Sequence, residues 1–207
     1  MMATIQQTHT PILNSNAQVL ILPVNSAGML LDPVLMRCKS LYTDNYQRYH
    51  RACRDGSLMA GSCLLHKRQR EQAGLSASHN GNQPDYIANL VVSNHPYHPT
   101  RSRWLNAALA DLQQQLLPLI RYQGVRKVAL LARPLLFENP ATLSAPSANS
   151  IDNKANLTND KQVTALGNTP NLIALDWQSV VLPLISSHLQ PLPKLRVDIH
   201  LPKSVAI

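Results

Sequence analysis

The sequence predicts an α/β fold in which a mixed, mostly parallel sheet lies between two layers of helices. Short apolar runs that are typical of buried strands alternate along the chain with amphipathic stretches that are typical of helices. The chain has 207 residues, of which 44% are hydrophobic and 14% are charged, which fits one globular domain over residues 1–207. The chain has only 7 glycines but 15 prolines, so few glycines are available for phosphate-binding loops.

Five apolar segments are expected to be strands. They are residues 19–24, 62–66, 86–93, 125–132 and 195–201. The first of them, VLILPV, ends at Asn25. Because ligands bind at the carboxyl ends of the strands in such sheets, the loops to inspect are 25–33, 93–103 and 133–173.

Four segments are expected to be helices. They are residues 34–42, 44–54, 104–124 and 176–189. Pro33 suits the first turn of the first helix, Thr43 can cap the second, and Gly124 ends the third. Two polar segments, 67–84 and 138–172, are expected to be loop insertions in the single domain.

The composition excludes several classes of protein. Cys38, Cys53 and Cys63 are odd in number and form no C-x-x-C motif, so neither a disulfide framework nor a zinc site is indicated. No basic segment precedes an apolar stretch at the N-terminus, and no apolar run reaches the roughly 20 residues of a membrane span. We expect a cytoplasmic protein that needs no metal and no cofactor and makes no membrane contact.

The positive charge is unevenly distributed. The formal net charge is +8, and most of the 19 Lys and Arg residues fall within 37–133. Such a segment can face nucleic acid or a phosphate-bearing ligand, but a basic surface that only faces water is the alternative. The same two interpretations apply to Arg101 and Arg103.

Several motifs carry a resemblance to a known family. The segment 23–65 begins PVNSAG and continues with NYQRYHRACRDG, and 86–96 reads YIANLVVSNHP. These segments resemble macro domains, in particular the macro-domain antitoxins that remove ADP-ribose from DNA. The matching positions in 23–65 are Val24, Asn25, Gly28, Asn45, Tyr49, Cys53, Gly56 and Gly61. The resemblance implies a three-layer macro domain with a six- or seven-stranded sheet and an ADP-ribose ligand.

The chain departs from this family in the segments that contact the ligand. The position that recognises adenine in the family corresponds to Pro11, and its Gly-Lys-Gly turn corresponds to Leu31, Asp32 and Pro33. The position of the catalytic lysine corresponds to Ser93. Because proline removes an N–H donor and a carboxylate repels phosphate, we expect catalysis to be weakened or lost.

The second Gly-rich loop of the family is also missing. RPLLFENPATLS, which begins at Arg133, and the insertion that follows replace it, and only Leu175, Asp176 and Trp177 match its end. Phosphate-binding loops need glycines that adopt positive φ and expose N–H groups. Of the 7 glycines, Gly28 alone stands where the family contacts its ligand.

The resemblance nevertheless implies a set of ligand contacts. They are Asn25, Ser26, Ala27, Gly28, Asn89 and Trp177. The Asn25 amide can bond a ribose hydroxyl. The alternatives are a strand-to-helix turn at Asn25 and Gly28, and packing at a helix start for Trp177.

The catalytic residues cannot be named from the sequence, and the candidates are Asn25, Ser93 and His95. No base partner for Ser93 is identifiable, and Cys53 lies on an apolar helical face typical of packing. His95 and His98 have no third metal ligand, so a surface loop is favoured over a metal site.

Three functions remain open. The first is an ADP-ribosyl glycohydrolase that acts on DNA or protein with a water positioned by Asn25. The second is a module that binds ADP-ribose without hydrolysis. The third is a pseudo-macro domain that binds protein or nucleic acid. We favour a divergent member with weakened or lost catalysis. Both an enzyme and a binding protein are compatible with the sequence.

Overall fold

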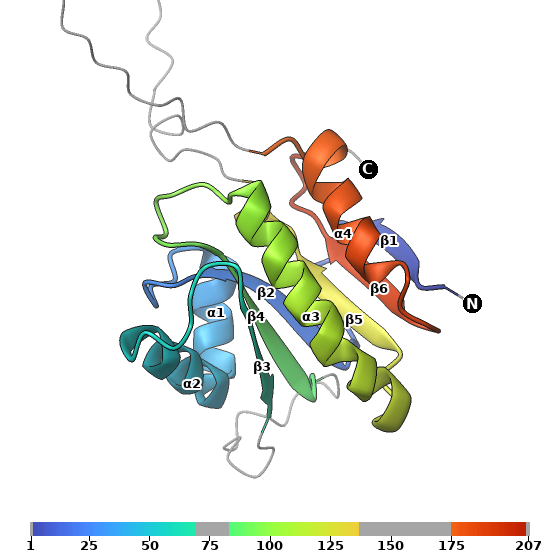
Figure 1. Ribbon diagram of the computed structural model, residues 1–207, viewed down its shortest axis with the longest axis horizontal. Helices are drawn as coiled ribbons and strands as arrows, with labels where there is room; N and C mark the ends of the chain where they lie inside the picture. Colours follow the sequence, from blue (N-terminus) through green and yellow to red (C-terminus); the bar gives the residue numbers. More distant parts are fainter. Residues whose placement is uncertain (1, 69–82, 137–174, 206–207) are drawn as a thin grey trace, which may run out of the picture.

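The computed structural model describes residues 2–68, 83–136 and 175–205 and contains a six-stranded sheet (Figure 1). The expected insertions 67–84 and 138–172 lie almost entirely outside the described residues. The strands are β1 (Thr4–Thr8), β2 (Val19–Asn25), β3 (Cys63–Lys67), β4 (Tyr86–Ser93), β5 (Lys127–Leu131) and β6 (Arg196–His200). The helices are α1 (Pro33–Leu41), α2 (Thr43–Arg54), α3 (Ser102–Tyr122) and α4 (Leu182–Leu189), with a π-helical turn (Trp177–Val181) before α4.

The sheet has the order β1-β6-β5-β2-β4-β3. Neighbouring strands are parallel except for β3, which runs antiparallel to β4 at one edge. The predicted mixed, mostly parallel sheet is therefore confirmed, and each of the five predicted strands is present. The additional strand β1, whose sequence is TIQQT, lies at the other edge, where a strand needs little apolar surface.

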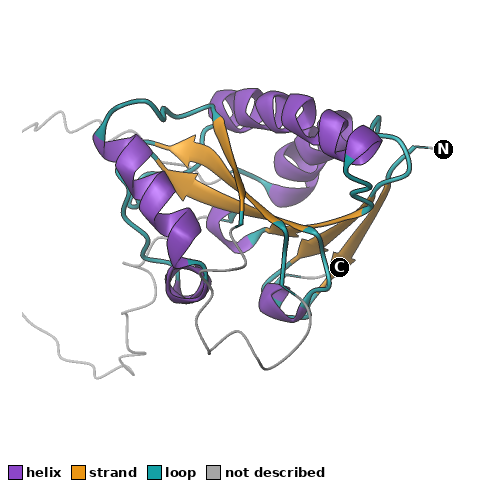
Figure 2. Cartoon of the chain, turned by 90° about the horizontal axis from the view of Figure 1, so that it is seen from below, coloured by secondary structure: helices purple, strands orange, loops and turns teal. Residues whose placement is uncertain are grey.

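Helices cover both faces of the sheet, as Figure 2 shows. On one face, Val19 and Ile21 of β2 belong to the core that packs against α3 and α4. On the other face, Leu20 and Leu22 belong to the core that packs against α1 and α2. This alternation along one strand divides the interior into two apolar layers and confirms the three-layer fold.

Helix α3 lies across the sheet beside α4 (Figure 1). Its stripe of four leucines, Leu105, Leu109, Leu112 and Leu116, is 0% exposed. Burying each such side chain contributes roughly 1.5–3 kcal/mol, so α3 fixes this face of the sheet. No helix of the described part of the chain is long and apolar enough to cross a membrane.

The polar side chains of α3 also complete the edge of the sheet. Asp111 accepts a hydrogen bond from the Cys63 N–H at 2.8 Å, and Gln115 donates to the Cys63 carbonyl at 2.8 Å. The first residue of the edge strand β3 thus has both of its backbone groups satisfied by one helix.

Candidate functional site

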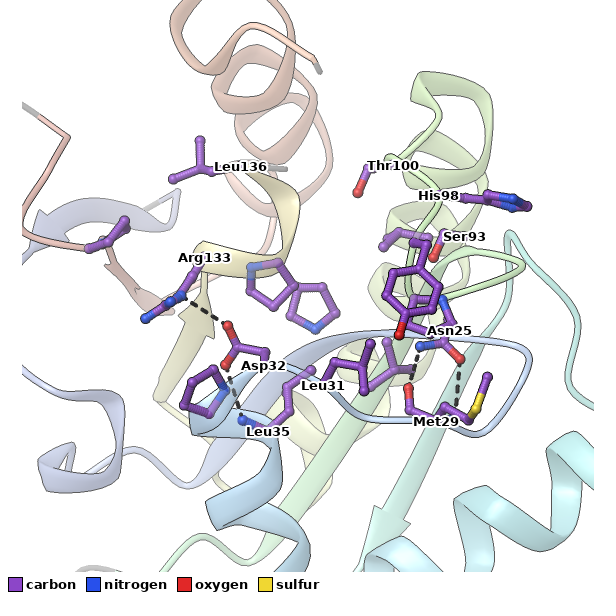
Figure 3. Close-up of a pocket in the computed structure, with 18 of the residues that line it drawn as sticks. Asn25, Met29, Leu31, Asp32, Leu35, Ser93, His98, Thr100, Arg133 and Leu136 are labelled. Carbon is purple, nitrogen blue, oxygen red and sulfur yellow. Dashed lines mark hydrogen bonds and ion pairs between the residues drawn. The ribbon is translucent and has the colours of Figure 1, made fainter. Parts of the chain in front are cut away.

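A cavity of about 450 Å³ lies at the carboxyl-terminal edge of the parallel strands (Figure 3). It is lined by residues of 23–25, 29–35, 92–100, 133–136 and 202–204. Each of the three loops in which the sequence predicts a ligand site, 25–33, 93–103 and 133–173, therefore contributes residues to the cavity. The lining combines apolar side chains with polar ones, which are Asn25, Asp32, Ser93, Tyr97, His98, Thr100, Arg133 and Ser204.

Asn25 is the last residue of β2 and lines this cavity. Its Nδ2 donates to the Met29 carbonyl at 2.5 Å, and its Oδ1 accepts from the Met29 N–H at 3.4 Å (Figure 3). The side chain thus closes the turn that follows the strand. An amide has two N–H donors and more than one acceptor position, so Asn25 keeps capacity to bond a ligand.

Helix α2 holds the backbone of Asn25 in place. The Tyr49 hydroxyl donates to the Asn25 carbonyl at 2.5 Å, and the Cys53 Sγ lies 3.8 Å from the same oxygen. Burial raises the pKa of the Tyr49 hydroxyl, which therefore stays a donor. Burial also raises the pKa of the Cys53 thiol, which fits the expected packing role rather than a nucleophile.

Gly28 lets the turn pass close to α2. Its φ is +74°, and a Cβ atom there would lie 3.3 Å from the Cys53 Cβ and 3.3 Å from the His50 Cδ2. Ser26, Ala27 and Gly28 were expected to contact the ligand, but none of them lines the cavity. The positive φ of Gly28 and its contacts with α2 fit the alternative interpretation, a turn that requires a left-handed residue.

Asn89 and Trp177, which were expected to contact the ligand, do not line this cavity. Asn89 lies inside β4, and it exchanges hydrogen bonds with Asn45 of α2 at 2.8 and 3.2 Å. Trp177 is 6% exposed in the core, and its Nε1 donates to Gln7 at 3.4 Å. The polar groups of both side chains thus have hydrogen-bond partners within the protein.

Of the catalytic candidates at the end of β4, only Ser93 lines the cavity. Its hydroxyl donates to the His95 carbonyl at 3.2 Å. The His95 ring instead stacks with Tyr97 and His98, at centroid distances of 5.3 and 5.4 Å. His98 lines the cavity, whereas the catalytic candidate His95 does not. The described residues contain no group of three or more His, Cys, Asp or Glu side chains placed to hold a metal ion.

The only ion pair among the described cavity-lining residues joins Asp32 to Arg133 (Figure 3). The Asp32 Oδ1 accepts from the N–H groups of Val34 and Leu35 at 2.8 and 3.2 Å and so caps α1. Its Oδ2 lies 3.1 Å from the Nε of Arg133. The sequence indicated an unopposed negative charge at Asp32, but both the amino terminus of α1 and the Arg133 guanidinium neutralise it.

Two sequence signals could have found this pair. Aspartate directly before a proline that starts a helix is typical of an N-cap followed by its first turn. Arg133 is the first charged residue after the apolar strand β5, at the edge of the sheet where ligands bind. The pairing itself depends on the sheet order, which places the end of β5 beside β2.

The hydrogen bond from Tyr49 to Asn25 is tested by Tyr49→Phe. We expect the free energy of unfolding to fall by about 1–3 kcal/mol, because the buried Asn25 carbonyl loses its hydroxyl donor. Tyr46→Phe on the same helix is the matched control, with an expected change within about 0.5 kcal/mol. Urea unfolding of both variants measures this, and equal losses would contradict the assigned hydrogen bond.

The packing of Gly28 against α2 is tested by comparing Gly28→Ala with Gly56→Ala. Both glycines have positive φ, but a Cβ at Gly56 would meet nothing within 4 Å. The alanine at position 56 should cost about 1 kcal/mol. The alanine at position 28 should cost about 1 kcal/mol or more beyond that, because it also crowds Cys53 and His50. Thermal unfolding that shifts equally in the two variants would show that the contact does not matter.

No family model matches the chain. A curated relative, the DNA ADP-ribosyl glycohydrolase of Thermus aquaticus, is 30% identical over 119 residues, which are 58% of this chain and 29% of that protein. The chain therefore spans less than a third of the length of the curated relative that it matches.

Solved structures share the fold over almost the whole chain. The macrodomain of Thermus aquaticus DarG superposes with a TM-score of 0.63 and 22% identity, covering 97% of this chain and 99% of that one. The macrodomain of Mycobacterium tuberculosis DarG gives a TM-score of 0.62 with 20% identity, again over 97% and 99% of the two chains. Thermosipho africanus DarTG in complex with ADP-ribose gives a TM-score of 0.63 with 18% identity, covering 100% of this chain and 45% of that one. The chain thus has the macrodomain fold, and the resemblance to macro domains is confirmed.

Proposed function

We propose that the chain binds ADP-ribose, or a closely related nucleotide, in the cavity and that its hydrolytic activity is weakened or lost. The observation that carries this proposal is the position of the cavity. It opens at the carboxyl ends of the central parallel strands, in a fold that is also seen in a protein solved in complex with ADP-ribose.

The size and lining of the cavity support a nucleotide ligand. Its volume of about 450 Å³ falls in the range of small-molecule pockets, which are mostly apolar with a few polar groups that set orientation. Tyr97 lines it with a side chain that is 58% exposed, which offers a flat surface for a heterocycle to stack on. Asn25 and Thr100 add hydrogen-bonding groups suited to a sugar.

Two polar groups of the described lining, Ser93 and Asp32, do not favour fast hydrolysis. Cleaving a glycosidic bond needs a general acid or base, or a charge that stabilises the leaving group. Ser93 occupies the position that the resemblance assigns to a lysine, and its neutral hydroxyl already bonds the His95 carbonyl. The Asp32 carboxylate is committed to the α1 cap and to Arg133, so it is poorly placed to activate water.

A second candidate function is binding to nucleic acid. Arg48, Arg51 and Arg54 are exposed on α2, and Arg101 and Arg103 both lie over the Trp104 ring, at 4.8 and 5.2 Å from its centroid. These side chains account for part of the basic segment found in the sequence. Their positive charge favours a phosphate backbone, with an affinity that falls as salt rises.

Calorimetric titration with ADP-ribose tests the proposed function. We expect saturable binding with a dissociation constant near or below roughly 10 μM, about −7 kcal/mol, since the cavity can enclose part of the nucleotide. Adding ADP-ribosylated DNA to the same protein should release little or no ADP-ribose.

Each alternative gives a different result in these experiments. Release of ADP-ribose that Asn25→Ala abolishes would identify a glycohydrolase and overturn the loss of catalysis. Absence of ADP-ribose binding, together with a salt-dependent gel shift of DNA, would favour the nucleic-acid function instead.

A further inference from the structure

We propose that the Arg133 guanidinium, positioned by Asp32, binds the phosphates of the ligand, so that the cavity recognises a nucleoside diphosphate through a side chain instead of a backbone loop. This inference rests on the proposed function and names the chemistry by which the cavity selects its ligand. It assigns a binding role to a residue that the family motifs do not contain.

The charges of the cavity point to Arg133. Among the described lining residues, it is the one side chain with a permanent positive charge. Its side chain is 51% exposed, whereas that of Asp32 is 13% exposed. The guanidinium therefore reaches the open space, while the carboxylate that pairs with it stays largely covered. A diphosphate entering this cavity would meet the positive partner of the pair first.

The geometry of the ion pair leaves the outer part of the guanidinium available. Asp32 contacts the Nε atom at 3.1 Å, and no hydrogen bond joins the two terminal nitrogens to a described residue. Those terminal nitrogens carry N–H donors in a planar fork that matches two phosphate oxygens. The ion pair through Nε thus holds the guanidinium beside Asp32 and leaves the fork open to a ligand.

The Asp32 carboxylate interacts with the amino terminus of α1 as well as with Arg133. It therefore cancels less of the positive charge of Arg133 than the distance of 3.1 Å between them suggests. The Asp32 Oδ1 accepts two N–H groups at the amino terminus of α1, where the helix dipole favours negative charge. A helix amino terminus is an attractive place for an anion, but Asp32 already occupies this one. A phosphate is therefore expected to bind more favourably at the guanidinium than at the occupied amino terminus of α1.

The described backbone around the cavity offers few alternative donors. Pro33, Pro134 and Pro202 line it, and proline has no N–H. Gly28, which has positive φ, lies outside the lining and packs on α2. Prolines thus remove several of the N–H groups that a concave backbone nest needs, which favours a charged side chain as the phosphate-binding group.

The experiment compares the full chain with Arg133→Gln, Arg133→Lys and the matched control Arg121→Gln, an exposed residue in the last turn of α3. Each protein is titrated calorimetrically with ADP-ribose, inorganic pyrophosphate and adenosine. We expect Arg133→Gln to weaken ADP-ribose binding about tenfold or more and Arg133→Lys to weaken it less, because lysine keeps the charge but loses the fork. Adenosine binding should stay unchanged in every variant, and Arg121→Gln should behave like the wild type.

The outcomes separate this inference from the proposed function. Wild-type binding of ADP-ribose that Arg133→Gln leaves within about twofold would overturn the inference and leave the function standing. Binding of pyrophosphate that depends on Arg133, without binding of ADP-ribose, would support the inference and overturn the function. A wild-type chain that binds neither anion would overturn both.

A second measurement covers the case in which Arg133→Gln folds poorly. Thermal unfolding reports the fold of each variant, and the half-exposed ion pair should contribute little to it. The ADP-ribose affinity of the wild type should fall as sodium chloride is raised, because a phosphate–guanidinium contact is screened. An affinity that is independent of salt would count against a phosphate held by Arg133.

Discussion

The Asp32 carboxylate joins two elements that the chemistry of the cavity depends on. One oxygen caps α1 and the other pairs with Arg133, which follows β5, so a single side chain fixes the helix terminus and orients a guanidinium. Aspartate at this place fills an anion site with an anion that belongs to the protein. The same contacts explain how the chain accommodates Asp32 before Pro33: α1 starts with a normal cap, and the charge of Asp32 is neutralised.

The residues that match the macro-domain pattern mostly support the scaffold. Tyr49 and Cys53 contact the Asn25 carbonyl, Asn45 pairs with Asn89, and Gly28 allows the turn to approach α2. These contacts hold the loop after β2 at the edge of the cavity. A chain can therefore keep these contacts, and with them the fold, while other residues of the cavity differ.

The sequence predicted the strands and helices with strong apolar periodicity, such as VLILPV and the leucine stripe of α3. It did not predict β1, because TIQQT has no apolar pattern and pairs at an edge. The resemblance implied ligand contacts for Asn89 and Trp177, and their partners within the protein, Asn45 and Gln7, could not be predicted because they are distant in sequence. The partnership of Arg133 with Asp32 was missed for the same reason, since only the strand order brings them together.

The most direct test of this account is a crystal structure of the protein with ADP-ribose. The account predicts diphosphate oxygens within about 3 Å of the terminal nitrogens of Arg133, a normal length for a charge-assisted hydrogen bond. Asp32 should still accept from the N–H groups of Val34 and Leu35. A diphosphate bound to those N–H groups, with the Asp32 carboxylate turned away from α1, would contradict it.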